Sequence, residues 1–173
     1  MTGLLSLSIA ASLALLLTWI VYPLWCSIRT RQGQHPGSRG EDRKSRVAAI
    51  IATRDEPALV ARRIDNLTHA DPAANITSIV VGVDATSAWS LRDYSRVSPP
   101  GVATFVAGAP PGGKATALNA AVAASPPSDL ILIADTAQTF APGAIRHLVD
   151  AIMAGGWSGA SGVVKPTNAG FLG

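Results

Sequence analysis

The chain has 173 residues, of which 48% are hydrophobic and 14% are charged, and its formal net charge is +3 at pH 7. This length suits one modest domain, and the apolar excess favours a membrane-directed segment over a free cytosolic protein. The chain's one cysteine, Cys26, excludes an internal disulfide framework and a zinc site made of several cysteines. Its basic residues gather in one segment without interleaved aromatic side chains, so we expect no nucleic-acid partner.

The first predicted element is a transmembrane helix over residues 1–28. No charged side chain occurs before Arg29, and residues 4–25 are mostly apolar, which is close to the ~20 residues that an α-helix needs to cross a bilayer. The apolar run ends in Tyr22-Pro23-Leu24-Trp25, a pattern typical of a membrane interface and not of a cleavable signal peptide. We therefore expect a single-pass membrane protein with an N-terminal anchor.

A basic juxtamembrane linker is predicted over residues 29–46. It contains six cations and two anions, namely Arg29, Arg31, Arg39, Arg43, Lys44 and Arg46 against Glu41 and Asp42. The linker therefore carries +4, and the rest of the chain is nearly neutral. The positive-inside rule then places the C-terminal domain in the cytoplasm, and the same charges suit contact with anionic lipids.

From residue 47 onward the sequence alternates between predicted strands and helices. Short apolar segments, mostly rich in valine and isoleucine, predict strands at residues 47–52, 78–83, 102–107, 130–134 and 160–164. Helix-compatible segments lie between them, at residues 57–67, 88–97, 113–124 and 142–154. Because the strands are apolar almost throughout, they predict a parallel sheet that is covered on both faces. The expected fold class is α/β: a transmembrane helix, then an open, mainly parallel Rossmann-like sheet with helices on both faces.

Polar residues follow the predicted strands at what would be one edge of the sheet. The set is Thr53, Asp55, Glu56, Asp84, Gly113, Lys114 and Asp135. Glycine lets backbone N–H groups approach an anion, and the start of a helix together with Lys114 adds positive charge. A carboxylate beside a diphosphate usually needs a divalent cation between them. These residues therefore predict a site for a nucleoside diphosphate and a metal ion.

Several blocks carry a family resemblance over residues 47–165. The most specific is Gly-Lys-Ala-Thr-Ala-Leu-Asn at residues 113–119. The others include Ala-Thr-Arg-Asp-Glu at 52–56, Arg-Arg-Ile-Asp-Asn-Leu at 62–67, Val-Gly-Val-Asp at 81–84 and Ile-Ala-Asp-Thr at 133–136. In these blocks and their order, the chain resembles the processive, membrane-associated family-2 glycosyltransferases, which have a GT-A nucleotide-sugar domain.

The resemblance implies a function and several residue roles. Glu56 and Asp84 would contact the uridine-like part of a nucleotide-sugar donor, commonly UDP-linked, and Lys114 would approach its diphosphate. Asp135 would begin a metal-binding D-x-D-type element that holds Mg²⁺ or Mn²⁺, while Asn119 closes the most specific block. The family transfers the sugar to a saccharide or lipid acceptor, and the metal stabilises the leaving nucleoside diphosphate.

Two departures from the family pattern qualify these roles. Ala137 replaces the second polar residue of the D-x-D-type element, which weakens the metal assignment without removing it. The sequence ends at Gly173, before the acceptor-side segment in which the family carries its catalytic base. We therefore expect residues 47–173 to be a partial GT-A domain, we nominate no catalytic residue, and we expect the chain alone to be inactive unless a partner chain supplies the acceptor half.

Two alternatives remain open at this point. The chain could be an inactive remnant or partner subunit that binds nucleotide weakly. It could also be a P-loop nucleotide hydrolase, because residues 108–114 fit G-x-x-x-x-G-K after a strand. Ala115 argues against the second alternative, since it lacks the hydroxyl that coordinates magnesium in a P-loop.

Overall fold

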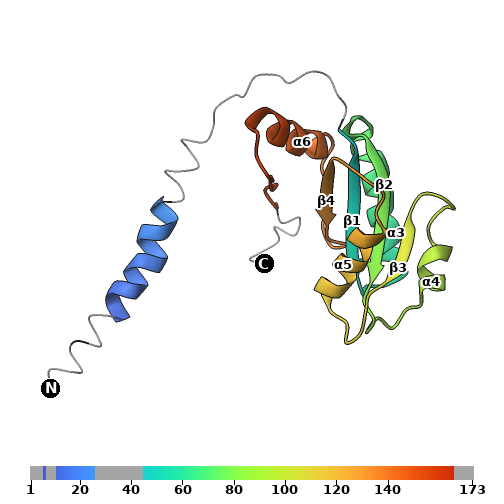
Figure 1. Cartoon of the computed structure of the whole chain (residues 1–173), viewed down its shortest axis with the longest axis horizontal. Coiled ribbons are helices and arrows are strands. Elements are labelled where there is room, and N and C mark those ends of the chain that lie inside the picture. The colour runs from blue at the N-terminus through green and yellow to red at the C-terminus, as the bar shows by residue number, and fades with distance from the viewer. Residues whose placement is uncertain (1–5, 7–10, 26–44, 166–173) are drawn as a thin grey trace, which may run out of the picture. The chain divides into compact units, whose positions relative to one another are not determined.

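The computed structural model describes residue 6, residues 11–25 and residues 45–165. Its main body is a four-stranded parallel sheet with the strand order β3-β2-β1-β4 (Figure 1). The strands are β1 (Val47–Thr53), β2 (Ile76–Val83), β3 (Thr104–Ala107) and β4 (Leu130–Ala134). The helices are α3 (Pro57–His69), α4 (Leu91–Arg96), α5 (Lys114–Ala124) and α6 (Ala144–Gly155), with the short 3-10 helix η2 (Pro72–Ala74) before β2. This is an α/β architecture consistent with a Rossmann-like fold.

Helices cover both faces of the sheet because alternate strand residues point to opposite sides. Every residue of β1 is buried. Ile51 packs on one face in a cluster that includes Ile64 of α3, Tyr94 of α4 and Ile145 of α6. Its neighbour Ile50 belongs to a second cluster, which contains residues of α5. The helix α5 therefore lies on the face opposite to the other three.

Local sequence explains where two of the helices begin. Pro57 is the first residue of α3, where its fixed φ suits the helix and its missing N–H costs nothing. Ser90 and Asp93 form a capping box at the start of α4, in which each side chain accepts a hydrogen bond from the other residue's backbone N–H. Both helices follow strands of the sheet, so their starts fix the lengths of the loops at its carboxyl edge.

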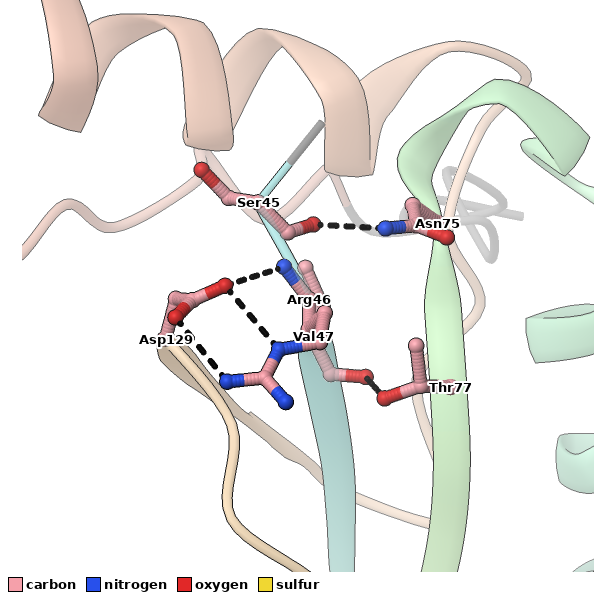
Figure 2. Close-up of polar contacts among 6 residues, drawn as sticks. All are labelled: Ser45, Arg46, Val47, Asn75, Thr77 and Asp129. Atoms are coloured by element: carbon pink, nitrogen blue, oxygen red, sulfur yellow. Dashed lines mark hydrogen bonds and ion pairs between the residues drawn. The ribbon is translucent and has the colours of Figure 1, made fainter. Parts of the chain in front are cut away.

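Figure 2 shows the polar contacts that close the opposite, amino edge of the sheet. Nδ2 of Asn75 donates to the carbonyl of Ser45 at 3.1 Å, and Oγ1 of Thr77 donates to a carbonyl of β1 at 3.3 Å. The carboxylate of Asp129 accepts the backbone N–H of Arg46 at 2.8 Å. These contacts tie the start of β1 to β2 on one side and to β4 on the other.

The transmembrane prediction over residues 1–28 was wrong. The described helical stretch covers residues 11–25 and contains the π-helical segment η1 (Leu17–Val21). No helix among the described residues combines the length and the apolar character needed to cross a membrane. The single-pass membrane location inferred from this helix was therefore wrong as well. The predicted linker over residues 29–46 lies outside the described residues, except for residues 45 and 46.

Four of the five predicted strands form, but residues 160–164 do not form a strand. The handedness of the connections gives the physical reason. The helix α3 connects β1 to β2, and α6 packs on the same face as α3. A parallel strand beyond β4, reached through α6, would move in the opposite direction across the sheet and would make a left-handed connection. Such connections are right-handed in about 98% of cases.

Candidate functional site

A cavity of about 360 Å³ lies at the carboxyl edge of the sheet. It is lined by Ala52, Thr53, Arg54, Asp55, Asp84, Gly113, Lys114, Ala117 and Asp135. The chain runs from β1 to β3 on one side and then crosses to β4 on the other side of β1. Ligands of open α/β sheets bind where the strand order reverses in this way, and the volume falls in the range of small-molecule sites.

The cavity brings together most of the predicted site residues, which come from four separate segments. Those that line it are Thr53, Asp55, Asp84, Gly113, Lys114 and Asp135. Glu56 and Asn119 are exposed and are not among the lining residues. Asn119 is five residues after Lys114 on α5, which places it about 140° around the helix. The spacing of the sequence block therefore does not put both of its polar ends into one cavity.

Lys114 and Asp135 form an ion pair in this cavity. Nζ of Lys114 donates to Oδ2 of Asp135 at 3.2 Å, and the two side chains are 60% and 42% exposed. The hydrogen bond from Lys114 is the main cause that lowers the pKa of Asp135 below its ordinary value. Because both groups reach solvent, the pair contributes at most about 1 kcal/mol. An incoming anion can therefore share or take over the ammonium group at little cost.

Asp84 holds the glycine turn that precedes α5. Its two carboxylate oxygens both accept the N–H of Gly113 at 3.0 Å, and Oδ1 also accepts the N–H and hydroxyl of Thr86 at 2.9 and 3.0 Å. These bonds, with Gly113 first, hold the pKa of Asp84 below its usual range. Gly113 has a φ of +107°, which favours glycine, and α5 begins at the next residue. Asp84 thus fixes the position of Lys114.

The same contact bears on the P-loop alternative. A P-loop directs the backbone N–H groups of its glycine-rich turn at phosphate oxygens. Here the N–H of Gly113 already donates to the carboxylate of Asp84. Together with the missing hydroxyl at Ala115, this geometry argues against a P-loop hydrolase.

Thr136 links the ends of β1 and β4, and the sequence block at 133–136 that contains it assigned it no role. Its hydroxyl donates to Oδ2 of Asp55, and the residue is buried. The backbone of Asp55 is held as well, since its N–H donates to Oγ1 of Thr53 at 3.0 Å and its carbonyl accepts the hydroxyl of Tyr94 at 2.6 Å. The signal in the sequence was a hydroxyl residue directly after Asp135.

A second group holds the loop after Asp135, and two of its residues belong to the sequence block at 62–67, to which no role was assigned. Arg63 is only 2% exposed, and its guanidinium lies 4.4 Å from the ring centre of Phe140. It donates to Oδ1 of Asn66 at 2.8 Å, and Asn66 in turn exchanges two hydrogen bonds with the backbone of Phe140, at 2.8 and 3.0 Å. Burial lowers the pKa of Arg63, and the nearby carboxylate of Asp135 acts in the opposite direction. We call Arg63, Asn66 and Phe140 the α3 clamp.

The residues around Asp135 offer a poor fit to the divalent cation that the resemblance implies. Mg²⁺ requires near-octahedral oxygen coordination, which proteins supply through carboxylates, carbonyls, water and phosphates. Asp135 is paired with the ammonium of Lys114, and Ala137 contributes only a methyl group. Asp84 and Asp55 are engaged by Gly113 and Thr136. The metal at Asp135 stays a prediction, and these donors would have to rearrange to hold it.

Comparison of the chain with protein-family models, curated proteins and solved structures gave no match. The resemblance to family-2 glycosyltransferases therefore rests on the sequence blocks and stays a prediction.

Proposed function

We propose that the chain binds the nucleoside diphosphate of a nucleotide-sugar donor, specifically a UDP-linked one. On this proposal it is the donor-binding part of a family-2-type glycosyltransferase that makes a polysaccharide or glycolipid from a saccharide or lipid acceptor. The observation that carries the proposal is the meeting of Lys114, at the start of α5, with strand-end carboxylates in one cavity. We assign no catalytic residue.

The start of α5 supports binding of the diphosphate. The first backbone N–H groups of an α-helix have no acceptor within the helix, and they give this end a partial positive charge. Lys114 is the first residue of α5 and adds a full charge at the same place. Phosphate groups bind well where these two features meet, and Gly113 and Lys114 both line the cavity.

The carboxylates suit the rest of the donor. Asp55 and Asp84 line the same cavity at the ends of the neighbouring strands β1 and β2. A carboxylate accepts hydrogen bonds from sugar hydroxyls and from the N–H of a base. The cavity therefore offers cationic groups for phosphates beside acceptors for a ribose and a base.

A titration tests the proposal. Isothermal calorimetry with UDP on the full chain should give heat, and Lys114→Ala should weaken binding by about tenfold, equivalent to 1.4 kcal/mol. Arg92→Ala is the matched control because it removes one exposed cation outside the cavity lining. The proposal fails if the wild-type chain gives no heat with UDP, or if Lys114→Ala and Arg92→Ala bind UDP equally.

One observation favours a second candidate, a nucleotide-binding subunit without transferase activity. Each carboxylate lining the cavity is engaged, Asp84 by Gly113, Asp55 by Thr136 and Asp135 by Lys114. In the part of the chain that the structure describes, the cavity therefore presents no free carboxylate as a base. The purified chain should release no UDP from UDP-sugars with saccharide acceptors, and steady release would reject this candidate.

A further inference from the structure

We propose that this cavity binds a nucleoside diphosphate without Mg²⁺ or Mn²⁺, with the Lys114 ammonium as the counter-charge of the phosphates. The inference rests on the proposed function, since it concerns the same cavity. It differs from what the resemblance implies, because there a divalent cation at Asp135 neutralises the diphosphate. The disagreement arises from the donor atoms that surround Asp135.

The first reason is the position of Lys114. Its Nζ lies 3.2 Å from Oδ2 of Asp135, so the cationic partner of this carboxylate is already a side chain of the protein. An ammonium group has three N–H donors. Lys114 can therefore keep one hydrogen bond to Asp135 while it donates others to phosphate oxygens. A divalent cation on the same carboxylate would face electrostatic repulsion from this ammonium.

The second reason is that the other carboxylates have structural partners. A metal ligated by Asp84 would compete with the N–H of Gly113 and with both donors of Thr86. Losing these bonds would release the turn that sets the start of α5. A metal ligated by Asp55 would compete with the hydroxyl of Thr136, which is buried. Metal coordination by Asp84 or Asp55 would therefore break hydrogen bonds that hold the lining of the cavity in place.

The third reason is the balance of charge around the cavity. The lining contributes two cations, Arg54 and Lys114, and three carboxylates. The buried Arg63 is not among the lining residues, but the charge of Asp135 acts on its pKa, so its positive charge offsets the excess of one carboxylate in the lining. The side chains are thus near neutrality without a metal. An incoming anion therefore encounters the ammonium of Lys114 and the positive end of α5, and the surrounding side chains carry no net negative charge that would repel it.

Calorimetry with and without metal tests this inference. UDP should bind the wild-type chain with a dissociation constant that agrees within about twofold between EDTA and millimolar Mn²⁺. Electron paramagnetic resonance of free Mn²⁺ gives a second readout, and the wild-type chain should leave the Mn²⁺ signal unchanged before UDP is added. Lys114→Gln should weaken UDP binding equally in EDTA and in Mn²⁺.

A variant designed to gain a metal-binding carboxylate provides a second test. Ala137→Asp introduces a second carboxylate at an exposed position two residues after Asp135. This variant should bind UDP about tenfold more tightly in Mn²⁺ than in EDTA. Ala123→Asp is the matched control, because it places the same substitution at an exposed site on α5 outside the cavity lining. It should show no dependence on Mn²⁺, and thermal melts should confirm that both variants fold.

The results of these experiments distinguish metal-independent binding from the proposed function. Binding of UDP to the wild-type chain only in Mn²⁺ would overturn metal independence and leave the proposed function standing. Absence of UDP binding under both conditions would overturn the proposed function itself. Equal Mn²⁺ dependence of Ala137→Asp and Ala123→Asp would contradict the role assigned to position 137.

Discussion

Asp84 shows how one side chain can organise a site without being left free to react. Its carboxylate accepts hydrogen bonds from Gly113 and Thr86, which lie on two different loops. The resemblance assigns this residue to the donor base, whereas the structure gives it a supporting task at the same place. The two roles are compatible only if a ligand approaches a lone pair that these donors leave open.

The pKa of Asp84 gives a prediction for the pH dependence of stability. Its pKa is lowered in the folded state, mainly by the N–H of Gly113, so its stabilising contribution is present above the unfolded pKa of about 3.9. That contribution is lost as the pH falls through the folded pKa. Asp84→Asn should lower the melting temperature at pH 7, and the two melting curves should converge at acidic pH.

The control for this prediction is Asp65→Asn, which changes an exposed carboxylate on α3 whose ion pair with His69 is itself exposed and contributes little. Its melting temperature should follow that of the wild-type chain from pH 7 to the acidic limit. A constant offset between wild type and Asp84→Asn at every pH would show that the ionised carboxylate is not what stabilises the turn.

Gly82 gives a second prediction at the scale of one residue. A Cβ at this position of β2 would overlap the backbone carbonyl of Ala117 in α5, so the helix would have to move. Gly82→Ala should lower the free energy of unfolding by about 1–3 kcal/mol in urea denaturation. Gly159→Ala meets no atom within 4 Å and should change it by less than about 0.5 kcal/mol. Equal effects would show that α5 does not depend on this close approach.

At the scale of elements, the α3 clamp connects a core helix to the loop that carries Asp135. Arg63 and Asn66 come from α3, while Phe140 lies between β4 and α6. The start of α6, where this loop ends, is held as well, because Oδ2 of Asp71 accepts the N–H of Arg146 at 2.7 Å. The loop conformation at Asp135 is therefore supported by α3 and by the residues that follow it.

Removing the clamp should have a measurable cost. Asn66→Ala deletes three hydrogen bonds, one from Arg63 and two with Phe140, and should lower the free energy of unfolding by about 2–3 kcal/mol. Asn119→Ala is the matched control, since Asn119 is exposed on α5. Chemical denaturation measures both variants. If Asn66→Ala lowers the free energy of unfolding no more than Asn119→Ala does, water replaces the hydrogen bonds of the α3 clamp at no cost in stability.

At the scale of the whole molecule, ligand binding should couple to folding. A ligand that binds only the folded state at 100 times its dissociation constant adds about 2.7 kcal/mol to the free energy of unfolding. UDP at that concentration should therefore raise the melting temperature of the wild-type chain, and uridine should raise it less because it lacks the diphosphate. Lys114→Ala at the same UDP concentration should show a smaller rise. An equal rise would place the phosphates away from Lys114.

The edge of the sheet illustrates a property that belongs to the whole fold. Ile131 and Ile133 of β4 are 50% and 62% exposed, since they lie on the face that carries α5 and α5 covers the other three strands. Their apolar character led to a correct strand prediction over residues 130–134. The same kind of pattern at 160–164 gave a wrong one, because apolar composition carries no information on the handedness of a connection.

Local sequence determined much of this protein. Continuous apolar runs specified the first four strands, Pro57 specified the start of α3, and the strand ends identified Asp55, Asp84 and Asp135, because these signals act over a few residues. Tertiary structure alone decided which polar groups pair: Asp84 with Gly113, Lys114 with Asp135, and Arg63 with the loop at Phe140. It also left Glu56 and Asn119 outside the cavity lining. Such contacts join segments 20 to 80 residues apart, and their geometry depends on strand order and helix direction, which short sequence patterns do not encode.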